Sequence, residues 1–345
     1  MKSVVACVKA SGNIEADLRK AVDLVGGFKP VEGSSIVIKP NLCTSRKGLG
    51  VTTDLEVVKA LVGYIRDNVK SCEITIVEGD SDASATEAFK RLGYAKWAKS
   101  EGVKLQNISE DKVVKIVLPR GKRLRTLLVP ETLLFMDYFV SVACLKRHAA
   151  ERLTGVWKNQ YGCIPQKHVR LDLHPFISEV LYDLNSVYWA DLSIIDARFG
   201  LEGSGPIEGT PKSIGYVICS NNPLAADVFA FGLVEGNAKR VPSIRYALKN
   251  LPDSVVFDVV GDAVNCDASL RYISYPQYLL YRFGMFVRRM GLRFVNLGTL
   301  FGMVAYALRV QKLSDLAGGK LLPTFAWPKI AWHMMTKIEA SERYS

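Results

Sequence analysis

Three of the four histidines of this 345-residue chain, His148, His168 and His174, fall within 27 residues. The same segment contains Lys146 and Lys158. Histidine titrates near neutral pH, so its clustering among lysines predicts a site that transfers protons or contacts an anion. We assign acid–base roles to His148, Lys158 and His174. Each of these residues could alternatively be a satisfied structural residue.

Small and amide-bearing residues surround these candidates. Thr154 and Gly155 allow close approach of the backbone to a ligand, and Lys158 and Asn159 follow them by a few residues. A second polar group, Lys39-Pro40-Asn41, follows an apolar run. We assign anion binding to Lys39, Asn41, Thr52, Thr53, Lys146, Thr154, Gly155 and Asn159.

Carboxylates are the third component. Asp196 and Glu202 are candidates to orient a histidine or a metal ion. Glu78, Asp80 and His168 are further metal candidates, although Asp80 equally fits a helix cap. The histidines lack an established zinc spacing, so an anion site suits the neighbouring lysines better. A divalent metal stays open as a cofactor.

Short β-branched runs alternate with helical patterns, which predicts an α/β fold with a mostly parallel sheet flanked by helices. Four strands follow closely on one another between Lys104 and Ala143, which predicts a hairpin-rich insertion or a mixed sheet edge. The expected strands are Val4–Val8, Ser35–Lys39, Glu73–Glu78, Leu105–Ile108, Val113–Leu118, Thr126–Val129, Tyr138–Ala143, Leu192–Asp196, Gly215–Ser220 and Val255–Val260. The expected helices are Ile14–Val25, Leu55–Asn68, Glu87–Leu92, Ala225–Leu233 and Ser243–Leu248.

These elements are expected to position the candidate residues. Lys39, Glu78 and Asp196 each end a predicted strand. Ligands of such sheets collect beyond the carboxyl ends of the strands, where loops converge. The glycines near Glu202 do not form a dinucleotide fingerprint, and the chain has no phosphate-loop motif, so a Rossmann site and a Walker-type NTPase are not expected.

The net charge of +11 divides unevenly along the chain. Residues 268–345 hold 11 basic and three acidic residues, whereas residues 1–267 are nearly neutral. We therefore expect an α/β body over 1–267 and a basic, aromatic, helical C-terminal extension over 268–345. Apolar and basic residues fall on different faces of a helix within this extension. We assign contact with a membrane or acidic partner to Arg282, Phe286, Arg288, Arg289 and Arg293.

The sequence leaves three interpretations of the extension open. In the first it lies on an anionic membrane surface, in the second it packs on the body or on a second subunit in a homo-oligomer, and in the third it binds nucleic acid. The apolar run before Lys9 is too short for a signal peptide. The seven cysteines are scattered, which predicts free thiols and no iron–sulfur cluster. We expect a cytoplasmic protein, with a peripheral position on the inner membrane face if the extension binds lipid.

Several motifs together resemble the domain of unknown function 362 family over about residues 35–235. They are Lys39-Pro40-Asn41, Thr52-Thr53, Lys146-Arg147-His148, the block from Thr154 to Gly162, Asp196 with Glu202 to Gly209, and Asn222-Pro223 with Asp227. This resemblance implies an α/β domain of poorly defined biochemistry. Many members add a ferredoxin-like iron–sulfur module, for which this chain has no cysteine motif.

His148, the loop from Thr154 to Lys158 and His174 are also similar to the nickel-pincer lactate racemase family, in which histidines and a lysine serve hydride-shuttling chemistry. The residues predict an enzyme that acts on a small carboxylate or phosphate by histidine and lysine acid–base chemistry. An isomerase- or racemase-like reaction is one form of it, and the reaction class is open. The alternatives are a non-catalytic ligand-binding or membrane-associated scaffold protein, and a nucleic-acid-binding protein.

Overall fold

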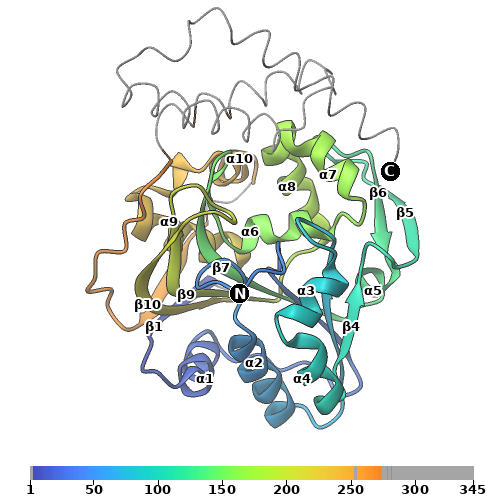
Figure 1. Ribbon diagram of the computed structural model, residues 1–345, viewed down its shortest axis with the longest axis horizontal. Coiled ribbons are helices and arrows are strands. Elements are labelled where there is room, and N and C mark those ends of the chain that lie inside the picture. Colours follow the sequence, from blue (N-terminus) through green and yellow to red (C-terminus); the bar gives the residue numbers. More distant parts are fainter. Residues whose placement is uncertain (1–2, 252–254, 274–277, 279–280, 282–345) are drawn as a thin grey trace, which may run out of the picture. The chain divides into compact units, whose positions relative to one another are not determined.

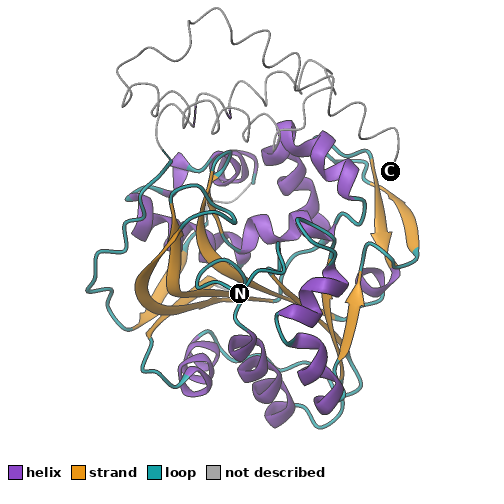
Figure 2. Cartoon of the chain, viewed as in Figure 1, coloured by secondary structure: helices purple, strands orange, loops and turns teal. Residues whose placement is uncertain are grey.

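The computed structural model describes residues 3–251, 255–273, 278 and 281. Its strands, coloured orange in Figure 2, alternate with helices along most of the chain. They are β1 (Ser3–Lys9), β2 (Ser35–Pro40), β3 (Glu73–Glu78), β4 (Lys104–Asn107), β5 (Val113–Val117), β6 (Thr126–Pro130), β7 (Tyr138–His148), β8 (Arg152–Thr154), β9 (Leu192–Glu202), β10 (Thr210–Ser220) and β11 (Phe257–Gly261).

A mixed sheet runs through the described part of the chain in the order β11-β1-β10-β9-β7-β2-β3-β4, with β8 paired to the end of β7 (Figure 1). Strands β9, β7, β2, β3 and β4 are parallel, as is the pair β1 and β11. Strand β10 is antiparallel to both of its neighbours. The predicted α/β class with a mostly parallel sheet is confirmed.

Helices cover both faces of this sheet (Figure 1). They are α1 (Ile14–Leu24), α2 (Leu55–Asn68), α3 (Ala85–Arg91), α4 (Tyr94–Glu101), α5 (Glu131–Leu134), α6 (Val156–Asn159), α7 (Lys167–Leu173), α8 (Ile177–Val187), α9 (Pro223–Glu235) and α10 (Pro242–Asn250). Short 3₁₀ turns lie at Gln160–Cys163, His174–Phe176 and Ala238–Arg240.

The period-2 alternation of the strands explains the two cores. On β2, Ile36 and Ile38 face the core that includes α1 and α2, whereas Val37 faces the core that includes α8 and α9. All three side chains are fully buried. A strand buried on both faces reads as a continuous apolar run, as parallel strands do.

The region between Lys104 and Ala143 contains the expected hairpin, but the expectation of a mixed sheet edge is wrong because the edge strand β4 pairs with β3 in parallel. Strands β4 and β7 join the main sheet, whereas β5 and β6 form a separate antiparallel hairpin. Strand β7 continues to His148 and β9 to Glu202, so Lys146 and His148 lie on a strand and not in a loop, and Asp196 lies within β9 instead of at its end. The ladder between β7 and β9 is irregular near Cys144 and Lys146, which interrupts the apolar pattern there.

Helices α4, α6, α7 and α8 were not predicted from the sequence. Helix α6 has four residues and α7 has seven, too few for a helical period to stand out. No described helix has the length and apolar character needed to cross a bilayer. The extension predicted over 268–345 lies mostly outside the described residues, as do Arg282, Phe286, Arg288, Arg289 and Arg293.

Candidate functional site

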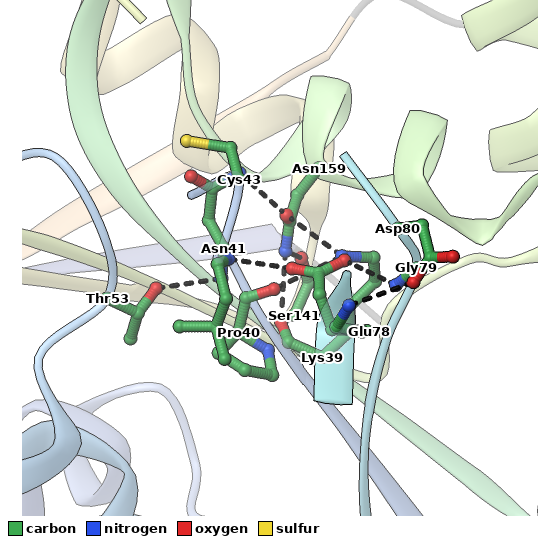
Figure 3. Close-up of polar contacts among 12 residues, drawn as sticks. Lys39, Pro40, Asn41, Cys43, Thr53, Glu78, Gly79, Asp80, Ser141 and Asn159 are labelled. Carbon is green, nitrogen blue, oxygen red and sulfur yellow. Dashed lines mark hydrogen bonds and ion pairs between the residues drawn. The ribbon is translucent and has the colours of Figure 1, made fainter. Parts of the chain in front are cut away.

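The site is built on the adjacent carboxyl ends of the parallel strands β2 and β3. Lys39 Nζ lies 2.5 Å from Glu78 Oε1, and both side chains are almost completely buried (Figure 3). A Cβ at Gly162 would lie only 2.9 Å from Lys39 Nζ, so glycine is needed where this backbone covers the ion pair. The pair is therefore shielded from solvent by main chain.

The Glu78 carboxylate also accepts two hydrogen bonds from backbone N–H groups. The Leu42 N–H donates to its Oε2 at 2.7 Å, and the Gly79 N–H donates to its Oε1 at 3.0 Å. Both carboxylate oxygens are thus used by the protein. Glu78 organises the loops after β2 and β3, and we give it a structural role.

Two asparagines extend the network from Lys39 to Lys146. Asn159 on α6 donates to the Lys39 carbonyl at 2.9 Å and to Ser141 Oγ at 3.1 Å. Its Oδ1 accepts from Asn41 Nδ2 at 3.3 Å. Asn41 Oδ1 in turn accepts from Lys146 Nζ at 2.6 Å. Residues from β2, β7 and α6 therefore form one connected polar group.

Thr53 holds the backbone of Asn41 in place through its hydroxyl group. Its hydroxyl donates to the Val142 carbonyl at 2.8 Å and accepts from the Asn41 N–H at 2.9 Å. Thr52 is also buried, and Asp54, which follows Thr53, caps α2 by accepting from the Glu56 N–H. The threonine pair thus supports the site.

Lys146 contacts only neutral acceptors. Besides Asn41, its fully buried ammonium donates to the Val51 carbonyl at 2.6 Å and to Cys43 Sγ at 3.2 Å. A buried ammonium is normally paired with a carboxylate. Lys146 thus contributes positive charge that the described residues in contact with it do not neutralise.

Lys158 is a second lysine without a carboxylate within ion-pair distance among the described residues, although the negative charge of Glu151 acts on it. In the described part of the chain its ammonium has no hydrogen-bond or ion-pair partner, and it lies 5.9 Å from the centroid of the Tyr161 ring. Burial lowers the pKa of Lys158 to about 8, and the positive charges of Lys146 and Lys39 act in the same direction, while Glu151 opposes them. Lys158 can therefore gain and lose a proton near neutral pH.

Two buried neutral groups close in sequence to Lys158 also lack hydrogen-bond partners among the described residues. Thr154 on β8 lies directly opposite Lys146 on β7, and its buried hydroxyl has no hydrogen bond with a described residue. Gln160 is fully buried, and neither its Nε2 nor its Oε1 has a partner there. Buried polar atoms normally find partners, so these atoms indicate a position for water or a ligand.

The histidines form an adjacent group. His148 is buried, and its Nδ1 accepts from the N–H groups of Ala150 and Glu151 at 3.1 and 3.3 Å. This arrangement leaves Nε2 to carry the proton. Burial holds the pKa of His148 well below its usual value, helped by Lys158, His174 and Lys146. His148 is neutral at pH 7, so it offers an N–H donor.

His174 packs on His148 with ring centroids 5.7 Å apart, and the edge of Tyr161 meets it at 5.9 Å. His174, Lys158 and Asn41 are each partly exposed, unlike most of the network. A separate surface pocket lies at the opposite ends of β2 and β7, and it is lined by Val31, Glu32, Gly33, Ser34, Asp137 and Tyr138.

Helix α6 is fixed by a carboxylate from α9. Asp227 accepts from the N–H groups of Val156 and Trp157 at 2.9 and 3.0 Å. Burial raises the pKa of Asp227 to about 7. A Cβ at Gly155 would lie 2.2 Å from Asp227 Oδ1, so Gly155 serves this contact.

Asp196 and Glu202 are bound by arginines. Arg198 donates to both oxygens of Asp196 at 2.9 Å and also reaches Asp54. Glu202 accepts from Arg271 Nε at 2.7 Å, and this hydrogen bond lowers the pKa of Glu202. In the described part of the chain both carboxylates accept hydrogen bonds from arginines and not from a histidine, so they do not orient a histidine here.

Glu78, Asp80 and His168, the three candidates for binding a metal ion, do not form a common cluster. Asp80 Oδ1 accepts from the Ala85 N–H at 2.9 Å and from Asn107 Nδ2 at 3.0 Å, which is the helix-capping alternative. His168 is exposed on α7. Over the described ranges, no three His, Cys, Asp or Glu side chains come together in a way that could hold a metal ion.

Sequence reasoning missed Cys43, Ser141 and Gln160. Gln160 directly follows Asn159, and Cys43 lies two residues after Asn41, so proximity to assigned residues was the available signal. Ser141 had no such signal. It joins the site because the strand pairing places it beside Lys39.

An α/β sheet with a cationic polar group at the carboxyl ends of its strands defines the general class of this protein. The model of the Domain of unknown function (DUF362) matches residues 36–232, and the chain belongs to this family. This finding confirms the family resemblance identified from the motifs.

The chain is also similar to two individual proteins. It is similar to a thylakoid-associated protein of Synechocystis sp., with 28% identity over 255 residues that cover 68% of this chain and 74% of the relative. Among solved structures it is similar to the lactate racemase apoprotein of Thermoanaerobacterium thermosaccharolyticum, with 14% identity and a TM-score of 0.40. That match covers 58% of this chain and 51% of the racemase, so the chain spans about half of its length.

Proposed function

We propose that this protein is an enzyme that acts on a small anionic substrate, a carboxylate or a phosphate compound. The observation that carries this proposal is the charge imbalance of the site. Lys39, Lys146 and Lys158 converge there, and only Lys39 has a carboxylate within ion-pair distance. A bound anion would supply the missing negative charge and accept hydrogen bonds from the ammonium groups.

The unpartnered neutral atoms support the same position for the ligand. Thr154 Oγ1 and the Gln160 amide could complete the contacts of an oxygen-rich molecule beside Lys146. In this proposal Lys146 and Asn41 orient the anion, and Lys158 is the group that binds it most directly. Lys158 is partly exposed, so it meets the ligand at the accessible side of the network.

Acid–base chemistry would then involve Lys158 and His148. With a pKa near 8, Lys158 can accept a proton as the free amine or hold one as the ammonium. His148 presents a neutral imidazole whose Nε2 carries a proton, so it could donate that proton or a hydrogen bond to a developing negative charge. His174 stacks against this ring and would keep its orientation. Removal and return of a proton, as in an isomerase or racemase, is the reaction that this pair fits best.

The test is ligand-induced thermal stabilisation of the full chain. Inorganic phosphate and a panel of small carboxylates are added in turn, and a ligand of the site should raise the unfolding temperature of the wild type. At a ligand concentration of 100 Kd the free energy of unfolding should rise by about 2.7 kcal/mol. Lys158→Met should abolish this shift and remain folded. Lys96→Met is the control, because it removes an exposed lysine of α4, a helix that contributes no residue to the candidate site. It should leave the ligand-induced shift unchanged.

Three results would contradict the proposal. They are the absence of a shift in the wild type with every anion, an unchanged shift in Lys158→Met, and an equal loss in Lys96→Met. Binding without turnover of any ligand that stabilises the protein would favour the non-catalytic scaffold. The ligand could then be identified by mass spectrometry of small molecules that copurify with the chain.

Association with an anionic membrane is a second candidate. Two observations favour it: the 11 basic residues of 268–345, and the similarity to a protein that is named thylakoid-associated. Flotation with anionic vesicles should carry the full chain upward, and replacing Arg288, Arg289 and Arg293 by glutamate should reduce this binding. If the full chain shifts RNA or DNA in a gel and does not float with anionic vesicles, the nucleic-acid alternative is favoured instead.

A further inference from the structure

We propose that the outer face of the β5–β6 hairpin docks on an anionic lipid surface. This hairpin lies outside the main sheet, at the edge of the unit in Figure 1. It does not include any residue of the candidate site or of the segment 268–345. The proposal therefore concerns a membrane contact made by the folded body itself.

The pairing register separates the two faces of the hairpin. Lys115 lies opposite Leu128, and Val117 lies opposite Thr126, so these side chains share one face with Val113. The other face turns inward, where Leu127 and Val129 are buried in the core.

The outer face is apolar and exposed. Val117 is 69% exposed, Val113 40% and Leu128 36%. Phe135, at the end of the short helix that follows the hairpin, is 69% exposed. Contiguous exposed apolar side chains on a folded protein commonly mark a contact surface.

Basic residues lie on this face, at Lys115, and near the turn between its strands, where Lys122 and Arg123 lie over the rings of Tyr182 and Phe176. Between residues 112 and 130 the chain has six basic residues and no acidic one. All six are exposed, and none forms an ion pair with a described residue. They are Lys112, Lys115, Arg120, Lys122, Arg123 and Arg125. Unneutralised positive charge around an apolar centre is the pattern of a protein surface that rests on anionic lipid headgroups.

The hairpin is held firmly to the body. The carboxylate of Asp183 on α8 accepts from the N–H groups of Lys122, Arg123 and Leu124 at 2.6, 2.7 and 2.7 Å. Arg123 also lies over the Phe176 ring at 3.5 Å. The outer face is thus presented by a fixed scaffold, so little ordering would be needed on binding.

Charge and residue type favour lipid over the other occupants. A second copy of the chain would bring the same six positive charges against this face, which opposes a symmetric contact. Single-stranded nucleic acid is bound through aromatic platforms, whereas Val113, Val117 and Leu128 are aliphatic. Acyl chains and anionic headgroups match both parts of the surface.

The experiment measures vesicle binding by the full chain. Sedimentation with phosphatidylcholine vesicles that contain phosphatidylglycerol should show binding, and pure phosphatidylcholine should show much less. Lys115→Glu with Arg120→Glu should weaken binding to the anionic vesicles by about tenfold or more. Val117→Ser with Leu128→Ser should also weaken it, and all four positions are exposed, so folding should be preserved.

A matched control makes the same charge change elsewhere. Lys96→Glu with Lys99→Glu alters two exposed lysines of α4 and should bind vesicles as the wild type does. The proposal is overturned if wild type does not bind, if the hairpin variants bind like wild type, or if the control loses as much binding. A dimer that dissociates in the hairpin variants, with vesicle binding unchanged, would assign this face to a second copy and overturn it too.

The result is separable from the proposed enzyme. The hairpin variants should keep their stabilisation by small anions, and Lys158→Met should keep its vesicle binding. Failure of one proposal therefore leaves the other standing. Because residues 268–345 are unchanged in every hairpin variant, a loss of binding is attributable to the hairpin.

Discussion

Lys39 and Lys158 show how neighbouring lysines of one site can differ in their task. Lys39 is covered by main chain and paired with Glu78, so it is satisfied within the protein. Lys158 is partly exposed and has no acceptor in the described part of the chain. A satisfied buried ion pair contributes to the arrangement of the site, whereas an unsatisfied ammonium is available to a ligand.

The Lys39–Glu78 pair gives the first prediction. Glu78→Gln should destabilise the protein by about 3–5 kcal/mol, because it leaves a buried ammonium without a counter-charge. Urea unfolding would measure the change. Glu87→Gln, which breaks the exposed pair with Arg91, is the control and should change stability by less than about 1 kcal/mol. Equal effects of the two substitutions would show that the buried pair has no special role.

Lys158 gives a prediction about pH. Its pKa is lowered from 10.5 to about 8, so between these values the unfolded chain binds more protons and stability rises with pH. Below about pH 8 the folded protein must hold an unfavourable charge. Lys158→Met should therefore be more stable than wild type at pH 7, and this advantage should shrink as the pH rises from 8 towards 10.5.

Binding of an anion should show the opposite trend. The ammonium of Lys158 is the form that attracts an anion, and it is lost as the pH rises through about 8. Phosphate-induced stabilisation of the wild type should therefore decline above that pH. Thermal unfolding at several pH values, with and without phosphate, measures both effects. A stabilisation that is constant from pH 7 to 10 would be inconsistent with a role for this ammonium.

At the scale of elements, a carboxylate from α9 positions the short helix that carries Lys158 and Asn159. Helix α6 has only four residues and cannot be stable by itself. Asp227 binds its first N–H groups, and Asn159 ties its end to β2 and β7. The site thus depends on contacts between elements far apart in the sequence.

Gly155 tests this dependence. Gly155→Ala should destabilise the protein by about 1–3 kcal/mol, because the new methyl group would displace Asp227 from α6. It should also reduce stabilisation by anions, since α6 carries Lys158. Gly63→Ala on α2 is the control, as no atom lies within 4 Å of its Cβ position and alanine favours a helix. Chemical unfolding should show a loss only in the first variant.

The last described residues also contact the segment between β7 and β8. Tyr272 donates to the Ala149 carbonyl at 2.5 Å, and its ring lies 4.6 Å from the Arg152 guanidinium. Arg147 donates to the Leu270 carbonyl and pairs with the buried Glu235 of α9. These contacts hold both sides of the turn that follows His148.

At the scale of the whole molecule, the division predicted from charge concerns residues 268–345. The chain divides into two compact units, 1–275 and 276–345, slightly beyond the compositional boundary. Both cores are built from residues up to Leu270. The described contacts of residues 267–272 lie within this first unit, and the functional division at residue 268 stays a prediction.

A chain that ends at Tyr275 tests the completeness of this unit. It should unfold cooperatively and keep its stabilisation by small anions, because both cores and the candidate site are retained. Its net charge falls, and part of any vesicle binding due to the removed basic residues should be lost. Calorimetry and vesicle sedimentation would measure these properties. An unfolded product would show that the later residues are required for the fold.

Local patterns were sufficient to predict the α/β class and the bounds of α2 and β3, whereas the functional roles assigned to Lys39 and to the segment from Lys146 to Asn159 stay predictions. The class and these bounds depend on hydrophobic period and on residues close in sequence. Helices α6 and α7 are too short to show such a period, whereas α8 has it at Ile177, Val180, Leu181 and Leu184 and was nevertheless missed. Strand β10 is antiparallel to its neighbours, and that direction depends on pairing with distant segments.

The partners of the charged residues also required the tertiary structure. Glu78 pairs with Lys39, 39 residues earlier in the chain, and Glu202 pairs with Arg271, 69 residues further along it. Nothing in local spacing distinguishes a carboxylate that meets an arginine from one that meets a histidine. Burial and charge pairing depend on distances in space, so only the folded chain reveals that Lys158 is left without an acceptor among the described residues.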